Sequence, residues 1–122
     1  MMKKILIVDD DKLIRALVKR TLMRKDVLIL EANSGESAVE IAKAEIPQLI
    51  FMDVIMKGKI DGFEATRILK KHPPMKKSTI IMLTSRNNES DKKKGFKSGA
   101  DDYLVKPFSP LDLSKKVEEI FG

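Results

Sequence analysis

The chain has 122 residues, a length that fits one compact domain with a single hydrophobic core. Hydrophobic residues make up 43% of it and charged residues 34%, a composition that favours a folded globular protein and excludes a disordered one. The formal net charge of +6 leaves three interpretations open: contact with nucleic acid, contact with an acidic protein, or a lysine-rich solvated surface. The absence of cysteine excludes disulfides, thiolate metal sites and cysteine nucleophiles.

The N-terminus superficially resembles a secretion signal, because Lys3 and Lys4 precede an apolar stretch. That stretch, residues 5–8, is only four residues long and runs directly into three aspartates. It is too short for a signal peptide, and no apolar run in the chain approaches the ~20 residues that span a bilayer. We therefore expect a cytoplasmic protein without membrane contact.

Short apolar runs alternate along the chain with amphipathic stretches. The runs have the length and aliphatic character of strands that are covered on both faces; they are residues 5–8, 27–30, 49–52, 80–83 and 103–105. Apolar residues at helical spacing follow most of them: Leu13, Ile14, Leu17, Val18 and Leu22; Ala38, Ile41 and Ala42; Ala65, Ile68 and Leu69; and Leu113, Val117 and Ile120.

Helix-capping residues support these boundaries. Ser109 is a predicted N-cap, with Pro110 at the first helical position and Asp112 at the third. Asn88 with Asp91 is a candidate cap for the fourth and weakest helix, which runs to Gly99, and Pro73-Pro74 ends the third. The sequence thus predicts an α/β domain of five β-α units, with a five-stranded parallel sheet flanked by helices on both faces.

Polar residues follow four of the predicted strands. Asp9 and Asp10 follow the first strand, Asp53 the third, Thr84 the fourth and Lys106 the fifth. In a parallel sheet these strand ends meet at one edge, where ligands bind. Three carboxylates gathered there repel one another and need a countercharge, and oxygen ligands suit a hard divalent cation such as Mg²⁺. A carboxylate beside Mg²⁺, a lysine and a hydroxyl is the set that phosphoryl transfer to Asp53 requires.

Four segments resemble the receiver domain of bacterial and archaeal two-component response regulators, the CheY-like family. They are Ile-Leu-Ile-Val-Asp-Asp-Asp at 5–11, Phe-Met-Asp at 51–53, Met-Leu-Thr-Ser at 82–85, and Gly-Ala-Asp-Asp-Tyr-Leu-Val-Lys-Pro-Phe at 99–108. Each motif alone is common, but together they occur in the family's order. The resemblance covers essentially the whole chain, so it implies one receiver domain over residues 1–122 with a doubly wound, flavodoxin-like fold.

The resemblance also assigns roles to individual residues. Asp53 resembles the phospho-acceptor and, with Lys106, the catalytic pair. Four groups resemble the ligands that hold Mg²⁺ in the family, and Mn²⁺ is a possible substitute for the ion. They are the side chains of Asp9, Asp10 and Asp53 and the backbone carbonyl of Ile55. Thr84 resembles the switch hydroxyl, Lys106 the phosphate-binding lysine that precedes a cis-proline, and Tyr103 the aromatic that turns inward. For Tyr103, ordinary packing at a strand end remains an alternative. Asp11 is interpreted as a helix N-terminal residue rather than as a ligand.

Two features depart from the usual pattern of the family. The segment after Asp53 lacks the usual Met-Pro and is one residue longer before Asp61-Gly62. Ser85 stands where alanine is more usual, but its small side chain keeps Asp53 accessible. We expect the roles above to hold with an altered geometry of this loop.

Rival functions lack their motifs. Gly58-Lys59 has neither the earlier glycine nor the hydroxyl of a phosphate-binding P-loop, and no dinucleotide-binding glycine pattern occurs. Aspartyl-phosphate phosphatases typically place a second aspartate two residues after the nucleophile, where this chain has Ile55. We therefore do not expect an enzyme. Direct nucleic-acid binding is not expected either, because charge is the only feature in its favour.

The resemblance implies a histidine kinase or histidine phosphotransfer protein as phosphoryl donor. We expect an unidentified output protein, for which an acidic protein is one candidate, to bind the lysine-rich face formed by Lys92, Lys93, Lys94, Lys97, Lys115 and Lys116. A monomer and a phosphorylation-dependent dimer are both compatible with the sequence. So are a stand-alone receiver and a fragment of a longer regulator or hybrid kinase.

Overall fold

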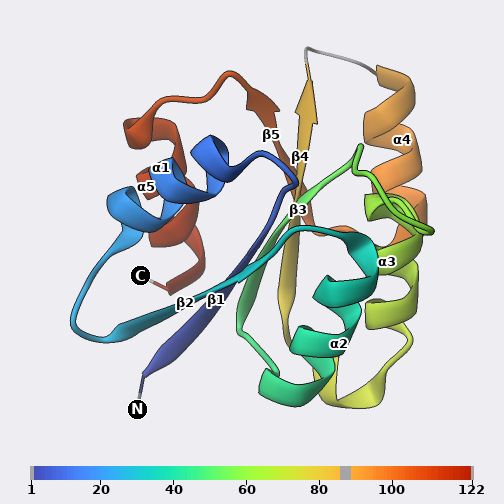
Figure 1. Cartoon of the computed structure of the whole chain (residues 1–122), viewed down its shortest axis with the longest axis horizontal. Helices are drawn as coiled ribbons and strands as arrows, with labels where there is room; N and C mark the ends of the chain where they lie inside the picture. Colours follow the sequence, from blue (N-terminus) through green and yellow to red (C-terminus); the bar gives the residue numbers. More distant parts are fainter. Residues whose placement is uncertain (1, 86–88, 122) are drawn as a thin grey trace.

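The computed structural model describes residues 2–85 and 89–121, and these form one parallel five-stranded sheet between two layers of helices (Figure 1). The strands are β1 (Lys3–Val8), β2 (Val27–Ala32), β3 (Leu49–Asp53), β4 (Thr79–Ser85) and β5 (Asp102–Lys106). The helices are α1 (Lys12–Leu22), α2 (Gly35–Glu45), α3 (Gly62–Lys70), α4 (Glu89–Ser98) and α5 (Pro110–Phe121), with a short 3₁₀ turn, η1 (Pro73–Met75). The predicted fold class is confirmed.

The sheet has the strand order β2-β1-β3-β4-β5, so the chain reverses direction across the sheet after β1 and β2. Helices α1 and α5 cover one face, and α2, α3 and α4 cover the other (Figure 1). Right-handed crossovers build such a doubly wound sheet, and its ligand site lies beyond the carboxyl ends of the strands, beside the strands where the order reverses. Here those strands are β1 and β3.

Alternate residues of the central strands pack into two separate cores. Leu6, Ile50 and Met82 face the layer that contains α2 and α3, where they meet residues such as Ala65 and Leu69. Ile5, Phe51, Ile81 and Leu83 face α1 and α5, where they meet Val18, Leu22, Leu113 and Val117. Both faces of the central strands are therefore buried, which explains why their sequences are continuously apolar rather than alternating.

The strands extend one or two residues beyond their predicted bounds because polar residues at their ends also pair with neighbours. Lys3 pairs with Val27 and Asp53 pairs with Leu83, although neither polar residue fits an apolar run. In α1, Leu13 and Leu17 are exposed although they belong to the apolar spacing that predicted the helix. The spacing therefore located α1 correctly but overstated the width of its buried stripe.

The described helix starts carry the predicted caps. Asp11 caps α1 by accepting a hydrogen bond from the Leu13 amide at 2.9 Å. Ser109 and Asp112 cap each other's amides at the start of α5, each at 3.1 Å. These reciprocal bonds satisfy donors that have no partner within the helix. The predicted cap of α4 involves Asn88, which lies outside the described residues.

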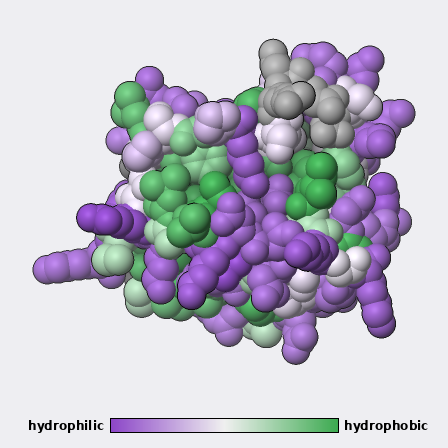
Figure 2. All heavy atoms as spheres, turned by 45° about the horizontal axis from the view of Figure 1, so that its top comes forward, coloured by the Kyte–Doolittle hydropathy of each residue, from purple (hydrophilic) through white to green (hydrophobic). Residues whose placement is uncertain are grey.

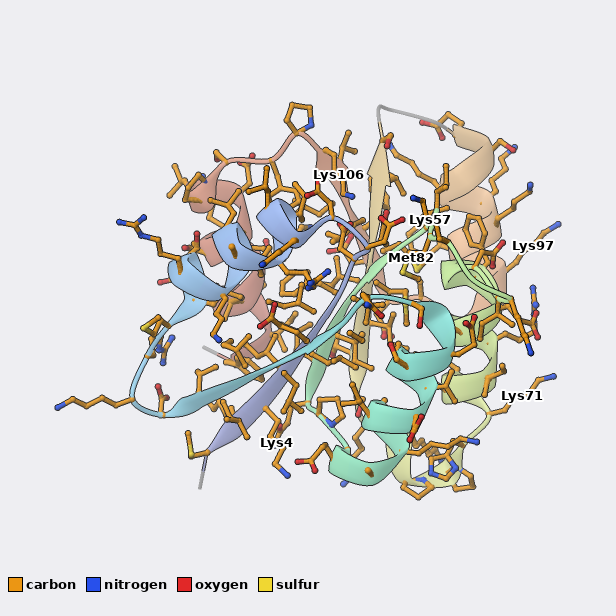
Figure 3. The ribbon with its side chains drawn as sticks, in the orientation of Figure 1. Lys4, Lys57, Lys71, Met82, Lys97 and Lys106 are labelled. Atoms are coloured by element: carbon orange, nitrogen blue, oxygen red, sulfur yellow. The ribbon has the colours of Figure 1, made fainter. Side chains whose placement is uncertain are left out.

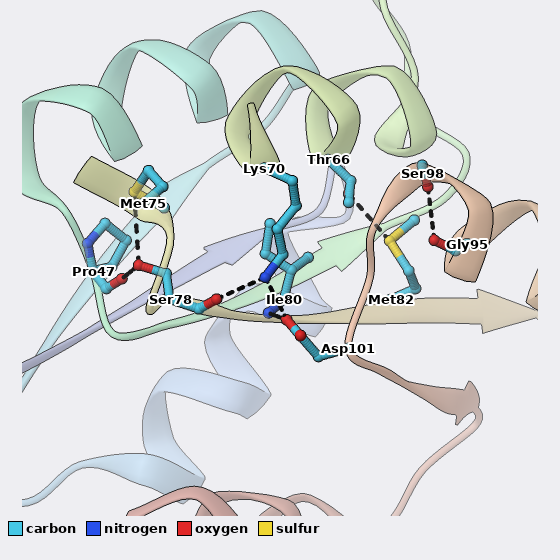
Figure 4. A network of polar contacts seen from close by, with 10 residues as sticks. All are labelled: Pro47, Thr66, Lys70, Met75, Ser78, Ile80, Met82, Gly95, Ser98 and Asp101. Atoms are coloured by element: carbon cyan, nitrogen blue, oxygen red, sulfur yellow. Dashed lines mark hydrogen bonds and ion pairs between the residues drawn. The ribbon is translucent and has the colours of Figure 1, made fainter. Parts of the chain in front are cut away.

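A polar network fixes the opposite, amino-terminal end of β4 (Figure 4). The Lys70 ammonium donates to the Ser78 carbonyl at 2.8 Å and pairs with Asp101 at 2.7 Å. Asp101 also accepts from the Ile80 amide at 2.8 Å, and the Ser78 hydroxyl donates to the Pro47 carbonyl at 2.7 Å. This network joins α3, β4 and the segment before β5. It gives the first aspartate of the Asp101-Asp102 pair a structural role far from the strand ends at which Asp53 and Lys106 lie.

Candidate functional site

The predicted site residues meet at the carboxyl edge of the sheet, as the strand pairing requires. Val8 pairs with Met52, so Asp9 and Asp53 follow adjacent positions on β1 and β3. Thr84 pairs with Val105, one residue before Lys106. Figure 3 shows Lys106 and Lys57 at this edge and Lys4 at the opposite end of the molecule.

Three carboxylates form a compact acidic cluster at this edge. Asp9, Asp10 and Asp53 each offer one oxygen, and these atoms all lie within 4.8 Å of one another. Asp9 is fully buried and Asp53 is 7% exposed, whereas Asp10 is open to solvent. An ion therefore has access from the side of Asp10, and the two buried carboxylates form the base of the cluster.

Lys106 is the basic residue of the cluster. Its ammonium group lies 2.7 Å from Asp9 Oδ2 and 3.3 Å from Asp53 Oδ1. The peptide bond between Lys106 and Pro107 is cis, as the resemblance implied. Burial on its own lowers the pKa of Lys106, but its interactions with Asp9 and Asp53 outweigh that effect, and the net pKa is raised. Lys106 is therefore a permanent positive charge beside Asp53.

One lysine does not balance the cluster. Burial, and then the nearby charge of Asp9, raise the pKa of Asp53 from 3.8 to about 6 even though Lys106 opposes the shift. Three carboxylates beside one ammonium group thus leave a surplus of negative charge in this partly buried site. A hard divalent cation with oxygen ligands relieves that surplus, so the residues present fit Mg²⁺.

Neighbouring residues hold Asp9 in place. Its Oδ1 atom accepts from the Asp11 amide at 2.9 Å, and its backbone carbonyl accepts from the Arg15 guanidinium at 2.8 Å. Arg15 in turn pairs with Glu31 on β2 at 3.2 Å. The sequence analysis missed Arg15. Its position four residues after the cap of α1, facing back along the helix, is the signal that identifies it.

The longer loop, residues 54–61, packs tightly on Asp53. A Cβ atom added to Gly62 would lie 2.0 Å from the Asp53 carbonyl oxygen, so only glycine permits this approach of α3. The Gly62 amide donates to the Val54 carbonyl at 3.0 Å, and the Asp61 side chain caps α3 by accepting from the Glu64 amide at 2.9 Å. The Asp-Gly pair after the loop therefore anchors it to the end of β3. The side chain of Ile55 is 71% exposed.

Thr84 on β4 and Tyr103 on β5 both belong to the packed contact between the sheet and α4, and Tyr103 pairs across the strands with Met82, two residues before Thr84. The Thr84 side chain is buried, and its hydroxyl has no hydrogen-bond partner among the described residues. The Tyr103 ring packs edge-on against Phe96 at 5.8 Å between centroids, and the Lys92 ammonium lies 4.2 Å from its centre. A buried hydroxyl without a partner is costly, which makes Thr84 a donor available for an incoming anion.

The site is surrounded by a mixed surface. Figure 2 brings the carboxyl edge of the sheet forward and shows hydrophobic groups in patches between hydrophilic ones. The exposed large apolar residues of the molecule include Leu13 and Leu17 on α1, Ile55 in the loop and Leu111 on α5. None of the described helices is long and apolar enough to cross a membrane. Ile55 and Arg86 lie two residues after Asp53 and Thr84, a spacing that predicts side chains flanking the approach of water to Asp53; Arg86 lies outside the described residues.

The fold, the acidic cluster and the lysine together define a phospho-acceptor domain of the signalling type. The sequence model of the response regulator receiver domain matches residues 5–118, so the chain belongs to that family. Phosphorylation-dependent switching is the known role of this family, and its members bind Mg²⁺ at an aspartate cluster of the kind formed here by Asp9, Asp10 and Asp53.

Individual relatives agree with this assignment. The alkaline phosphatase synthesis transcriptional regulatory protein PhoP of Bacillus subtilis is 41% identical over 98% of this chain and 49% of its own length. The transcriptional regulatory protein SrrA of Staphylococcus aureus is 41% identical over 98% of this chain and 48% of its own length. The chain thus spans about half the length of these curated relatives.

Solved structures show the same fold. The chemotaxis response regulator CheY4 of Vibrio cholerae superposes with a TM-score of 0.91 at 32% identity, covering 99% of this chain and all of that one (100%). A BeF₃-activated DrrB receiver domain superposes with a TM-score of 0.85 at 32% identity, covering 98% of this chain and 97% of that one.

Proposed function

We propose that residues 1–122 form a single receiver domain in which Asp53 accepts a phosphoryl group from a phosphohistidine. An oxygen of the Asp53 carboxylate attacks phosphorus, and an acyl phosphate forms. The bond between phosphorus and the donor's imidazole nitrogen breaks, and that nitrogen keeps the electron pair and is then protonated. The observation that carries this proposal is the pairing of one lysine, Lys106, with both Asp9 and Asp53 at 2.7 and 3.3 Å.

The cation belongs to the same proposal. Asp9, Asp10, Asp53 and the carbonyl of Ile55 would hold Mg²⁺, with Mn²⁺ as a substitute because it also prefers oxygen ligands. When bound, the ion offsets charge on the phosphoryl oxygens. Lys106 offsets the same charge from the other side, because its ammonium group is already next to Asp53.

Thr84 and Tyr103 complete the proposed switch. The Thr84 hydroxyl donates to a phosphoryl oxygen, which gives this buried group the partner that it lacks among the described residues. As Thr84 moves, Tyr103 turns inward and leaves its contact with Phe96. The result is a shift between two arrangements of the surface formed by α4 and β5, which a partner protein can distinguish.

A histidine kinase or histidine phosphotransfer protein is the proposed donor, and an acidic protein the proposed output partner. We assign the chain to signalling rather than to enzymatic turnover, and to the cytoplasm, because family membership fits both. Lys94 and Lys97 support the acidic partner, since they line a groove of about 450 Å³ between α3 and α4, together with Lys59 and Arg67. Direct contact with nucleic acid is not part of the proposal.

Phosphorylation with acetyl phosphate and Mg²⁺, followed by intact-mass measurement, tests the proposed function. The wild-type chain should gain one acid-labile phosphoryl group, and the Asp53→Asn variant should gain none. Asp10→Ala should weaken Mg²⁺ binding severely. Asp26→Asn is the matched control, because Asp26 is an exposed aspartate in the turn before β2. Full labelling of Asp53→Asn would contradict the assignment.

A further inference from the structure

The start of α2 packs against the middle of loop 54–61. The Glu36 Oε1 atom accepts a hydrogen bond from the Ile60 amide at 2.8 Å, although the two residues are 24 positions apart. A Cβ atom added to Gly58 would lie 2.8 Å from one Glu36 carboxylate oxygen and 3.0 Å from the other. Gly35 is equally close, because its added Cβ would lie 2.7 Å from the Ile60 carbonyl oxygen. The Glu36 carboxylate therefore fits against a specific conformation of the loop.

The same loop reaches the acidic cluster. The Lys57 amide lies 3.4 Å from Asp10 Oδ2, a long hydrogen bond, and Ile55 supplies the carbonyl of the proposed cation site. The first residue of the loop, Val54, is attached to β4 because its amide donates to the Leu83 carbonyl, and to α3 because its carbonyl accepts from the Gly62 amide. Two carboxylates from other elements, Asp10 and Glu36, hold the middle. Asp10 belongs to the metal cluster, whereas Glu36 does not.

The start of α2 that carries Glu36 is capped. It lies in the first turn of α2, which Ser34 caps by accepting from the Ser37 amide at 3.2 Å. A helix start of this kind also favours a negative charge through its dipole. The charge and the hydrogen bond are separable, because glutamine keeps one oxygen that can accept from the Ile60 amide while it removes the charge and replaces the other oxygen by an amide NH2 group.

From these contacts we infer that Glu36 is a positioning residue for the cation site: its carboxylate holds loop 54–61 in the conformation that presents the Ile55 carbonyl beside Asp10. The loop is one residue longer than usual, so it has more conformations to lose when an ion binds. A contact that holds the loop in place beforehand, such as the one from Glu36, reduces this cost. The inference rests on the proposed function, because it concerns the same Mg²⁺ site.

The first test measures the loop in the metal-free chain. Hydrogen exchange of the Ile60 amide, followed by NMR, should speed up about threefold to tenfold in Glu36→Ala, the factor that one hydrogen bond accounts for. Glu36→Gln should keep most of the protection. Glu40→Ala is the matched control, since Glu40 lies one turn further along α2 and is exposed. Unchanged exchange in Glu36→Ala would overturn the inference.

The second test is a Mg²⁺ titration of the same variants, followed by the amide shifts of Asp10 and Lys57. The Mg²⁺ dissociation constant should rise about threefold to tenfold in Glu36→Ala, and less than about twofold in Glu36→Gln and Glu40→Ala. If the charge acts through the helix dipole alone, both Glu36 variants lose the same stability and neither loses Mg²⁺ affinity, which overturns the inference. Absence of Mg²⁺ binding by the wild-type chain overturns the proposed function as well, so the two failures are distinguishable.

Discussion

Asp53 lies where its own charge is disfavoured. Burial and the charge of Asp9 raise its pKa to about 6, and Lys106 only partly compensates. The folded chain therefore favours the protonated form of Asp53 more than the unfolded chain does. A residue selected for stability alone would be neutral here, so the carboxylate is explained by chemistry that needs a nucleophile and an ion ligand.

The first prediction follows from the sign of that shift. An acid whose pKa is raised on folding contributes stability below its unfolded pKa of 3.8, and this contribution is lost as the pH rises through about 6. In a buffer that contains a metal chelator, the Asp53→Asn variant should therefore be more stable than wild type by about 3 kcal/mol above pH 7. Below about pH 4 the two proteins should be equally stable. Urea unfolding across this pH range measures the difference. A constant difference at all pH values would show that protonation is not its cause.

The second prediction concerns the lifetime of the phosphoryl group. Ile55 lies two residues after Asp53 with a side chain that is 71% exposed, and an apolar group does not orient water by hydrogen bonding. Ile55→Asn should therefore speed dephosphorylation. The measurement is loss of the phosphoryl group over time by intact mass. Ile55→Val serves as the control that keeps an apolar side chain, and an unchanged or slower rate in Ile55→Asn would count against the idea.

At the scale of elements, the start of α3 packs very closely against the end of β3, beside the site. Gly62→Ala should destabilise the fold by about 1–3 kcal/mol, because the added methyl group meets the Asp53 carbonyl oxygen and the backbone must move. Gly95→Ala is the matched control: it lies within α4, and among the described residues the nearest atoms to its added Cβ belong to Met82 at 3.4 Å and Phe63 at 3.9 Å, which is ordinary contact. Alanine's better helix propensity should make this control neutral or stabilising. Equal losses in the two variants, measured by urea unfolding, would contradict the proposed clash.

The strands and helices themselves could be predicted from the sequence because each of them leaves a local pattern. Apolar runs mark the strands, and the Ser109 and Asp11 caps mark helix starts, so their positions follow from neighbouring residues. The coming together of Asp9, Asp53, Thr84 and Lys106 was also predictable, since parallel strands end at one edge. The elements needed only local patterns, and the convergence needed only the prediction that the strands are parallel.

Contacts between distant elements could not be predicted from the sequence. Glu36 binds the Ile60 amide across 24 residues, and nothing in the spacing of α2 indicates which loop its first turn will meet. Gly62 is recognisable as a turn residue, but its approach to Asp53 depends on how α3 packs. The sequence predicted a basic face of six lysines that all have the same role. The structure separates them, because Lys92 lies on the Tyr103 ring and Lys116 pairs with Asp102 at 2.6 Å.

Across the whole molecule, the lysines behind the net charge of +6 do not contribute equally to the attraction of a partner. Lys70, Lys106 and Lys116 are used in internal ion pairs and are not available to a partner. The groove between α3 and α4 gathers Lys59, Arg67, Lys94 and Lys97 with two acids, Asp61 and Glu64. The four basic groups outnumber the two acids, and one of the acids, Glu64, pairs with Arg67, so the groove has a local excess of positive charge. This excess favours an acidic partner.

The last prediction is that this attraction comes from Lys94 and Lys97, which line the groove, with an added contribution from Lys93, an exposed neighbour on α4 that lies outside the groove lining. With a glutamate-rich peptide as a probe of acidic surfaces, reversal of all three to glutamate should slow association while phosphorylation at Asp53 stays intact. Binding to the wild-type chain should weaken as salt rises, because the screening length falls to about 8 Å near 0.15 M salt. The matched control reverses Lys43, Lys71 and Lys77, which are exposed and lie outside the groove, and thus makes the same change in net charge. Equal effects of the two triple variants would mean that net charge acts without a preferred face. Binding untouched by reversal at 93, 94 and 97 would move the output surface elsewhere, and α1, where Leu13 and Leu17 are exposed, is then the next surface to test.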